Sequence, residues 1–225
     1  MRVLFQNKAE DAGITALYEN ANYPVSNLVS RFLRKRFQST ANSDTVTIDF
    51  GAITAISSVF YGYTNATSVT INVYDGVTLL ETCTDLDCFS FPEVQADKVE
   101  IVLTASSPVY LGGVGVGVAY ELPPPSSFWT ESYQDRSLVS ESQSGQVLQE
   151  YVEPLIGFDF AWNMLSRDQA RGLLAQYKAV GVGRPLWIAP ETDDIDPLYA
   201  RITDAMGASK DKRRYSVRMN IREAR

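Results

Sequence analysis

Short runs in which apolar and polar residues alternate dominate the first half of this 225-residue chain. Three runs each place alternate apolar residues on one face: Val46, Ile48 and Phe50; Val69, Ile71 and Val73; and Val99, Ile101 and Leu103. A period of two is typical of a half-buried β-strand, and Asp75-Gly76 after the second run is a turn signal. Such strands, separated by turns, predict an antiparallel β-sandwich.

The stretch "ELPPPSSF", from Glu121 to Phe128, marks a domain boundary. Three consecutive prolines favour an extended conformation and cannot sit inside a sheet. We therefore expect a first domain at residues 1–121, a stiff linker at 122–127 and a second domain at 128–225.

The second half also contains strand patterns, beginning with a hairpin that turns at Ser144-Gly145. The run "IGFDFAWNML" places Phe158, Phe160, Trp162 and Met164 on one face. In the last run, Tyr215, Val217, Met219 and Ile221 face inward, and Arg214, Ser216, Arg218, Asn220 and Arg222 face outward. This half is therefore predicted to be a second β-sandwich.

One segment of the second half predicts a helix at residues 167–180. Ser166 and Gln169 have the spacing of a capping box, and Gly181 is suited to a C-terminal cap. Four apolar residues recur at helical spacing: Ala170, Leu173, Leu174 and Tyr177. A helix of this length is marginal alone in water, so it requires a sheet to pack against. The whole chain is thus expected to be mainly β, with one amphipathic helix on the second sandwich.

Composition argues against several functions. The chain has no histidine, which removes the usual general base near neutral pH, and two cysteines alone do not form a structural zinc site. The "GVGRP" and "GGVGVGV" runs lack the strand-loop-helix context of a phosphate site. We expect no enzyme activity, no catalytic residues, no cofactor and no metal. A net charge of −7 and the lack of a long apolar run predict neither nucleic-acid binding nor membrane insertion.

The region from Asn20 to Tyr120 resembles the galactose-binding-like, discoidin-type β-sandwich family. Four segments carry the resemblance in order: "YPVSNLV", "RKRFQS", "TVTIDFG" and "GGVGVGV". The Asp-Gly pair that usually follows the family's opening segment is replaced by "SRFL". The resemblance implies a possible host glycan as partner, and hence a carbohydrate-binding adhesin as the alternative function.

The second half resembles minor or distal tail proteins of long-tailed phages. The matching segments are "FDFAWNMLSRDQARGLLAQYKAVGVGRPLWIAP", "LYARITD" and "YSVRMNIREA". This resemblance implies a structural protein of the virion tail, assembled in the host cytoplasm. It would form a ring of identical subunits, six-fold or, as second choice, three-fold, that joins the tail tube to hub or fibre proteins. It is the leading functional expectation.

Two groups of residues are candidate contacts. Arg34, Lys35 and Arg36 lie in a basic, aromatic stretch that is either a solvated loop, a contact with an acidic protein or, with Tyr61 and Tyr63, a glycan site. Ser209–Arg225 holds seven Lys or Arg and two Asp or Glu, a net +5, so the remaining chain carries −12. Arg214, Arg218 and Arg222 are therefore candidates for a subunit interface, unless they only shield an exposed edge strand. Cys83 and Cys88 are expected to be free thiols, with a disulfide between them as the alternative in an oxidising medium.

Overall fold

The computed structural model describes most of the chain, in nine stretches: residues 1–30, 35–84, 88–125, 130–134, 138–141, 147–150, 155–189, 197–211 and 214–224. The chain divides into two compact units. Unit 1 comprises residues 1–124, 184–199 and 224, and unit 2 comprises residues 125–183, 200–223 and 225. The predicted mainly β fold with one amphipathic helix is confirmed.

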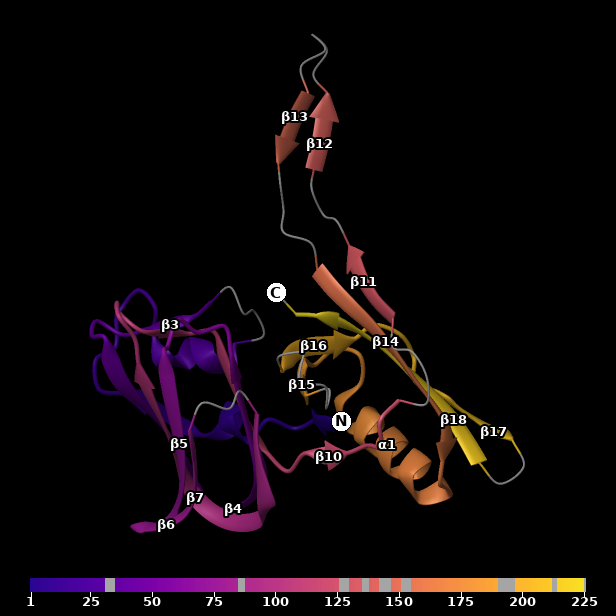
Figure 1. The fold of residues 1–225 in the computed structure, drawn as a ribbon, viewed down its shortest axis with the longest axis horizontal. Helices are drawn as coiled ribbons and strands as arrows, with labels where there is room; N and C mark the ends of the chain where they lie inside the picture. The colour runs from indigo at the N-terminus through magenta and orange to yellow at the C-terminus, as the bar shows by residue number, and fades with distance from the viewer. Residues whose placement is uncertain are drawn as a thin grey trace. The chain divides into compact units, whose positions relative to one another are not determined.

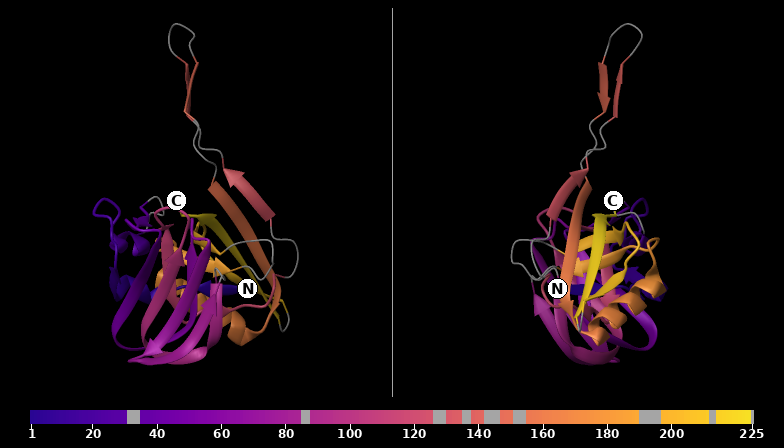
Figure 2. Two further views of the ribbon diagram at one scale, coloured as in Figure 1. Left: turned by 60° about the vertical axis from the view of Figure 1, so that its left-hand side comes forward. Right: turned by 90° about the vertical axis from the view of Figure 1, so that its right-hand side faces the viewer.

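The main sheet of unit 1 is antiparallel and has the strand order β2-β4-β7-β5-β6, with β9 also paired to β4. Figure 1 and Figure 2 show β4, β5 and β7 side by side. The strands of this main sheet are β2 (Gly13–Ala16), β4 (Ser43–Gly62), β5 (Ser68–Asp75), β6 (Thr78–Thr84), β7 (Cys88–Thr104) and β9 (Gly113–Gly117). Two short strands, β3 (Phe37–Gln38) and β8 (Tyr110–Leu111), pair with each other. Residues 1–124 of unit 1 also contain the 3-10 helices η1 (Lys8–Asp11) and η2 (Val25–Val29).

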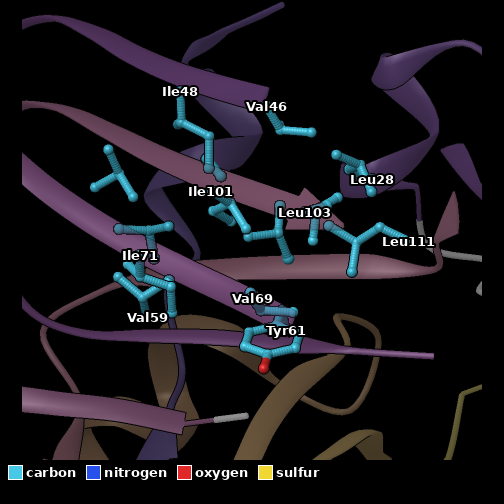
Figure 3. Packing of buried hydrophobic residues seen from close by; sticks show 14 of the residues in the cluster. Leu28, Val46, Ile48, Val59, Tyr61, Val69, Ile71, Ile101, Leu103 and Leu111 are labelled. Carbon is cyan, nitrogen blue, oxygen red and sulfur yellow. The ribbon is translucent and has the colours of Figure 1, made fainter. Parts of the chain in front are cut away.

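The core of unit 1 lies on the apolar face that the sequence predicts. Val46 and Ile48 of β4 and Ile101 and Leu103 of β7 are fully buried, and Figure 3 shows them packed with Ile71 of β5. The β4–β7 ladder shifts register between Asp49 and Thr54 and again between Ile56 and Ser58. Register shifts of this kind bend a strand. The end of β4 consequently pairs with β9 rather than β2.

A segment from late in the sequence completes unit 1. Strand β1 (Arg2–Leu4) pairs with β10 (Tyr120–Glu121) on one side and with β15 (Leu186–Ala189) on the other. Trp187 of β15 is 1% exposed and packs with Leu4, Phe60 and Tyr199. The predicted division at the prolines therefore omits residues 184–199, which belong with unit 1. Sequence patterning identifies β15 as a strand but carries no information on its partner.

Unit 2 is built on an antiparallel sheet in which β18 pairs with β14 and β14 pairs with β11. On its other side β18 pairs with β16 and β17. The strands are β11 (Thr130–Gln134), β14 (Leu155–Leu165), β16 (Leu198–Ile202), β17 (Ala208–Asp211) and β18 (Arg214–Glu223). Phe158, Phe160 and Trp162 are buried as predicted, but Met164 is 67% exposed. The β14–β18 ladder shifts register between Trp162 and Leu165, so Leu165 takes the inward position.

The predicted helix is present as α1 (Arg167–Val180). The Ser166 hydroxyl accepts a hydrogen bond from the Gln169 amide at 3.2 Å, and the Gln169 side chain accepts one from the Ser166 amide at 2.9 Å. Gly181, with φ of 67°, ends the helix. Ala170 and Leu173 are buried, and α1 packs against β18. Within the described part of the chain, no helix is long and apolar enough to cross a membrane.

A separate two-stranded ladder in unit 2 consists of β12 (Leu138–Glu141) and β13 (Val147–Glu150). It confirms the predicted hairpin, although its turn at Ser144-Gly145 lies outside the described residues.

Candidate functional site

A cluster of one arginine and two tyrosines lies where β3 meets β8 in unit 1. Phe37 of β3 faces Leu111 of β8 across the ladder, and both side chains are fully buried. Because side chains alternate along a strand, Arg36 and Tyr110, the neighbours of these core residues, point to the opposite side. The Arg36 guanidinium carbon lies 4.4 Å from the centroid of the Tyr110 ring and 5.7 Å from that of Tyr23. We call Tyr23, Arg36 and Tyr110 the tyrosine–arginine surface.

Hydrogen bonds to the main chain hold each member of this surface in place. Asn27 donates to the Arg36 carbonyl at 3.0 Å, and the Gln38 amide donates to the Tyr23 carbonyl at 3.1 Å. The Tyr110 amide donates to the Asn65 side chain at 2.8 Å. The cation–π contacts fix the guanidinium in addition. These contacts make the surface rigid. It is also open to solvent, because Arg36 is half-buried and Tyr23 is 41% exposed.

The structure separates the residues that sequence reasoning grouped as a glycan contact. Tyr61 is 2% exposed and packs in the core of unit 1, so its ring cannot meet a ligand (Figure 3). Tyr63, with φ of 60°, is half-buried and packs against the cluster around Trp187. Lys35 is exposed beside Arg36, and Arg34 lies outside the described residues.

Sequence reasoning missed both aromatic partners of Arg36. Tyr110 is directly followed by the buried Leu111, and Tyr23 precedes Pro24 in the segment "NANYPV". The alternation around Leu111 places Tyr110 on the outer face, but only the β3–β8 pairing brings it to Arg36.

A second contact between a cation and a tyrosine ring lies on the outer face of unit 1 and can be compared with that of Arg36. Lys98 of β7 faces Tyr74 of β5 across the ladder, with its amine 4.5 Å from the ring centroid. The same amine forms a 2.9 Å ion pair with Glu100. This hydrogen-bonded ion pair raises the pKa of the Lys98 amine above its ordinary value. Lys98 therefore has a carboxylate partner in addition to its ring.

The predicted interface arginines lie on the outward face of β18 in unit 2. Arg214 and Arg218 are exposed and Arg222 is half-buried, while Val217, Met219 and Ile221 are buried. The predicted faces of this strand are thus confirmed. The alternative of an exposed edge strand does not fit most of β18, because β14 pairs along one side and β16 and β17 pair with parts of the other. Arg214 and Arg222 therefore have strand partners on this side and do not lie at an exposed edge.

A groove of about 290 Å³ opens on unit 2 beside Arg222. Its lining residues come from three strands, β11, β14 and β18, and from the loop after β16: Ser132, Leu155, Gly157, Asp159, Thr203, Asp204, Asn220, Ile221 and Arg222. Asn220 donates to Asp204 at 2.8 Å. A Cβ on Gly157 would lie 2.8 Å from the Ser132 hydroxyl, so the absence of a side chain there keeps the groove open.

The described residues contain no group of three or more His, Cys, Asp or Glu side chains placed to hold a metal ion. Residues 85–87, between Cys83 and Cys88, lie outside the description, so the expectation of free thiols stays a prediction.

No protein-family model matches this chain, and no curated protein matches it either. Solved structures similar to it include the chitosan-binding module 1 of a chitosanase/glucanase from Paenibacillus sp. IK-5, at 19% identity and a TM-score of 0.42, which covers 49% of this chain and 98% of that one. A fucose-binding module, SpX-3, from Streptococcus pneumoniae matches at 17% identity and a TM-score of 0.43. The match covers 52% of this chain and 99% of that one. A third structure, SpGH29, matches at 14% identity and a TM-score of 0.45, and the match covers 53% of this chain and only 29% of that one.

Proposed function

We propose that unit 1 is a non-catalytic carbohydrate-binding module whose ligand contacts the tyrosine–arginine surface. The observation that carries the proposal is the Arg36 guanidinium held 4.4 Å from the Tyr110 ring and beside the partly exposed Tyr23. Arginine offers five hydrogen-bond donors in a fixed plane, which suits a ligand rich in hydroxyl or carboxylate oxygens. Exposed aromatic rings supply apolar area against which a sugar ring can pack.

Rigidity supports binding at this surface. A side chain that is ordered before the ligand arrives loses less conformational entropy on binding, commonly about 0.5–1.5 kcal/mol for each long side chain. Arg36 is ordered by its two ring contacts and by its place beside the buried Phe37. The neighbours named for chitosan and fucose binding overlap with this chain at TM-scores of 0.42 and 0.43, which is too low to add to the argument.

A glycan array followed by calorimetry on the full chain tests the proposal. The full chain is required because unit 1 includes residues 184–199. We expect saturable binding of at least one glycan, and at least ~10-fold weaker binding for both Tyr110→Ala and Arg36→Gln, since each removes ring or donor contacts. Tyr74→Ala is the matched control, because it removes a tyrosine of unit 1 that contacts a cation, Lys98, but lies outside the tyrosine–arginine surface. Binding that survives Arg36→Gln and Tyr110→Ala, or an array without any hit, contradicts the proposal.

A second candidate is a self-assembling structural protein of a virion tail, as the sequence of the second half suggests. The observation that favours assembly is charge segregation: Arg214 and Arg218 are exposed on the outward face of β18, while the chain outside Ser209–Arg225 carries −12. A closed ring joins two different patches on each subunit, and opposite charges on them would guide its register. Six-fold symmetry, tail-tube and hub or fibre partners, and location in the virion remain predictions of this candidate.

A further inference from the structure

Tyr18 is a further exposed tyrosine of unit 1, and its segment extends the ladder that carries the tyrosine–arginine surface. Glu19 and Ser39 form an antiparallel bridge, which sets Tyr18 opposite Thr40. The Thr40 amide donates to the Tyr18 carbonyl at 2.7 Å, and the Ser39 hydroxyl donates to the same carbonyl at 3.1 Å. Residues 18–20 therefore lie alongside residues 38–40, which continue from β3.

The side chain of Tyr18 lies on the same side of this ladder as that of Arg36. Phe37 and Ser39 are fully buried. Because side chains alternate along an extended segment, their neighbours point outward: Arg36, Gln38 and Thr40. Tyr18 is the cross-strand partner of Thr40 and shares its face. Tyr18 and the tyrosine–arginine surface are therefore parts of one outward face, with Gln38 between them.

A buried carboxylate holds the Tyr18 segment in place. Asp44 is 3% exposed, and its two oxygens accept from the Leu17 amide at 3.0 Å and from the Tyr18 amide at 3.2 Å. The Tyr18 side chain nevertheless leaves Tyr18 53% exposed. A large ring exposed on an ordered backbone is suited to packing against a ligand, since less conformational entropy is lost on binding.

The two ends of this outward face are too far apart to contact one sugar ring together. Arg36 and Thr40 are four residues apart along an extended segment, which corresponds to about 13 Å at roughly 3.3 Å per residue. Tyr18 lies opposite Thr40 and so stands at the end remote from Arg36. Gln38 is half-buried between the ends, and its amide can both donate to and accept from hydroxyl groups. A ligand that contacts both ends must therefore contain several units joined in a chain.

We propose that unit 1 binds a chain of several sugar units, in which Tyr18 packs against a unit other than the one that Arg36 and Tyr110 contact. This inference rests on the proposed carbohydrate-binding function and names the class of carbohydrate. Arg36 and Tyr110 contribute to binding at every chain length, whereas Tyr18 contributes only when the chain is long enough to reach it. Tyr18 is thus the residue that sets a preference for chains over single sugars.

Calorimetry on the full chain with oligomers of defined length tests this division of roles. The probes are oligomers of N-acetylglucosamine, of galactose and of galacturonic acid, each from the single sugar to the hexamer. We expect the hexamer of at least one series to bind at least ~10-fold tighter than its single sugar or dimer. Tyr18→Ala should remove most of this gain and leave the affinity for the short probes within about twofold, while Arg36→Gln should weaken binding at every length. Tyr18→Phe keeps the ring and should keep the gain.

Tyr133→Ala is the matched control, because Tyr133 is a tyrosine of unit 2 that is 65% exposed. Circular dichroism of each variant establishes that the fold is intact, which is expected for Tyr18→Ala because the amide that Asp44 accepts from is retained. If the glycan array yields hits but the long probes bind no tighter than the short ones or fail to bind, this inference alone is overturned. The same holds if Tyr18→Ala behaves like Tyr133→Ala. An array without any hit overturns the proposed carbohydrate-binding function as well.

Discussion

Unit 1 and unit 2 bury their large aromatic side chains by different routes. In unit 2, Phe158, Phe160 and Trp162 follow one another along a single strand, and their rings lie 6.0 Å apart in sequence order. In unit 1, Trp187 arrives on β15 from late in the chain and packs 6.2 Å from Phe60 and 5.1 Å from Tyr199. Local alternation is enough to specify the first arrangement, whereas the second depends on which distant strands pair.

This difference predicts that unit 1 is the more vulnerable to a single change. Removing an aromatic side chain from a buried site commonly costs about 3–5 kcal/mol. Because β15 also pairs with β1, loss of the Trp187 contacts affects the start and the end of the unit together.

The largest effect is expected for Trp187→Ala. The side chain is 1% exposed, so its removal leaves a cavity among Leu4, Phe60 and Tyr199. We expect the free energy of unfolding, measured by urea titration with circular dichroism, to fall by about 3–5 kcal/mol. Met164→Ala is the control, since Met164 is 67% exposed and should change stability by less than about 0.5 kcal/mol. Equal losses in the two variants would show that β15 does not close the core.

An intermediate effect is expected for Gly115→Ala, which tests the same contact from the side of β9. A Cβ at position 115 would lie 2.7 Å from the Trp187 ring nitrogen and 3.0 Å from Leu4. Overpacking of a closed core typically costs about 1–3 kcal/mol. Gly183→Ala, where a Cβ meets nothing within 4 Å, should leave the melting temperature almost unchanged. A neutral Gly115→Ala would mean that Trp187 moves aside at little cost.

The smallest effect is expected in unit 2, for Ser166→Ala. This change removes the hydroxyl that caps α1 and leaves the Gln169 amide without its 3.2 Å partner. Loss of such a cap costs about 0.5–2 kcal/mol. Ser209→Ala, an exposed serine of β17 in the same unit, serves as the control in the same urea titration. A loss as large as that of Trp187→Ala would remove the distinction between the two units.

Residue patterns predicted much of the fold. The bounds of α1 and both of its caps follow from Ser166, Gln169 and Gly181, because those preferences act within a few residues. The faces of β4, β5, β7 and β18 follow from alternation for the same reason. Met164 was misplaced because one register shift reverses every inward and outward position beyond it.

The candidate site was predicted only in part. Arg36 stands out as a charge beside the apolar Phe37, but its partner Tyr110 is brought to it by the β3–β8 ladder. Tyr61 has the composition of a sugar contact and yet lies in the core, since burial depends on the strands that cover it. The position of β18 inside its sheet could not be predicted from the sequence either, because an interior strand differs from an edge strand only in its pairing partners.

The pairing of β1 with β15 also sets an order of events during protein synthesis. Residues 1–124 leave the ribosome well before Trp187. During that interval Leu4 and Phe60 lack the Trp187 side chain that packs against them in the finished fold. Contacts between residues far apart in sequence form slowly, and apolar surface exposed in the meantime promotes aggregation. The nascent first unit is therefore expected to be a chaperone client until β15 emerges, whereas α1 can begin to form as soon as its own residues are made.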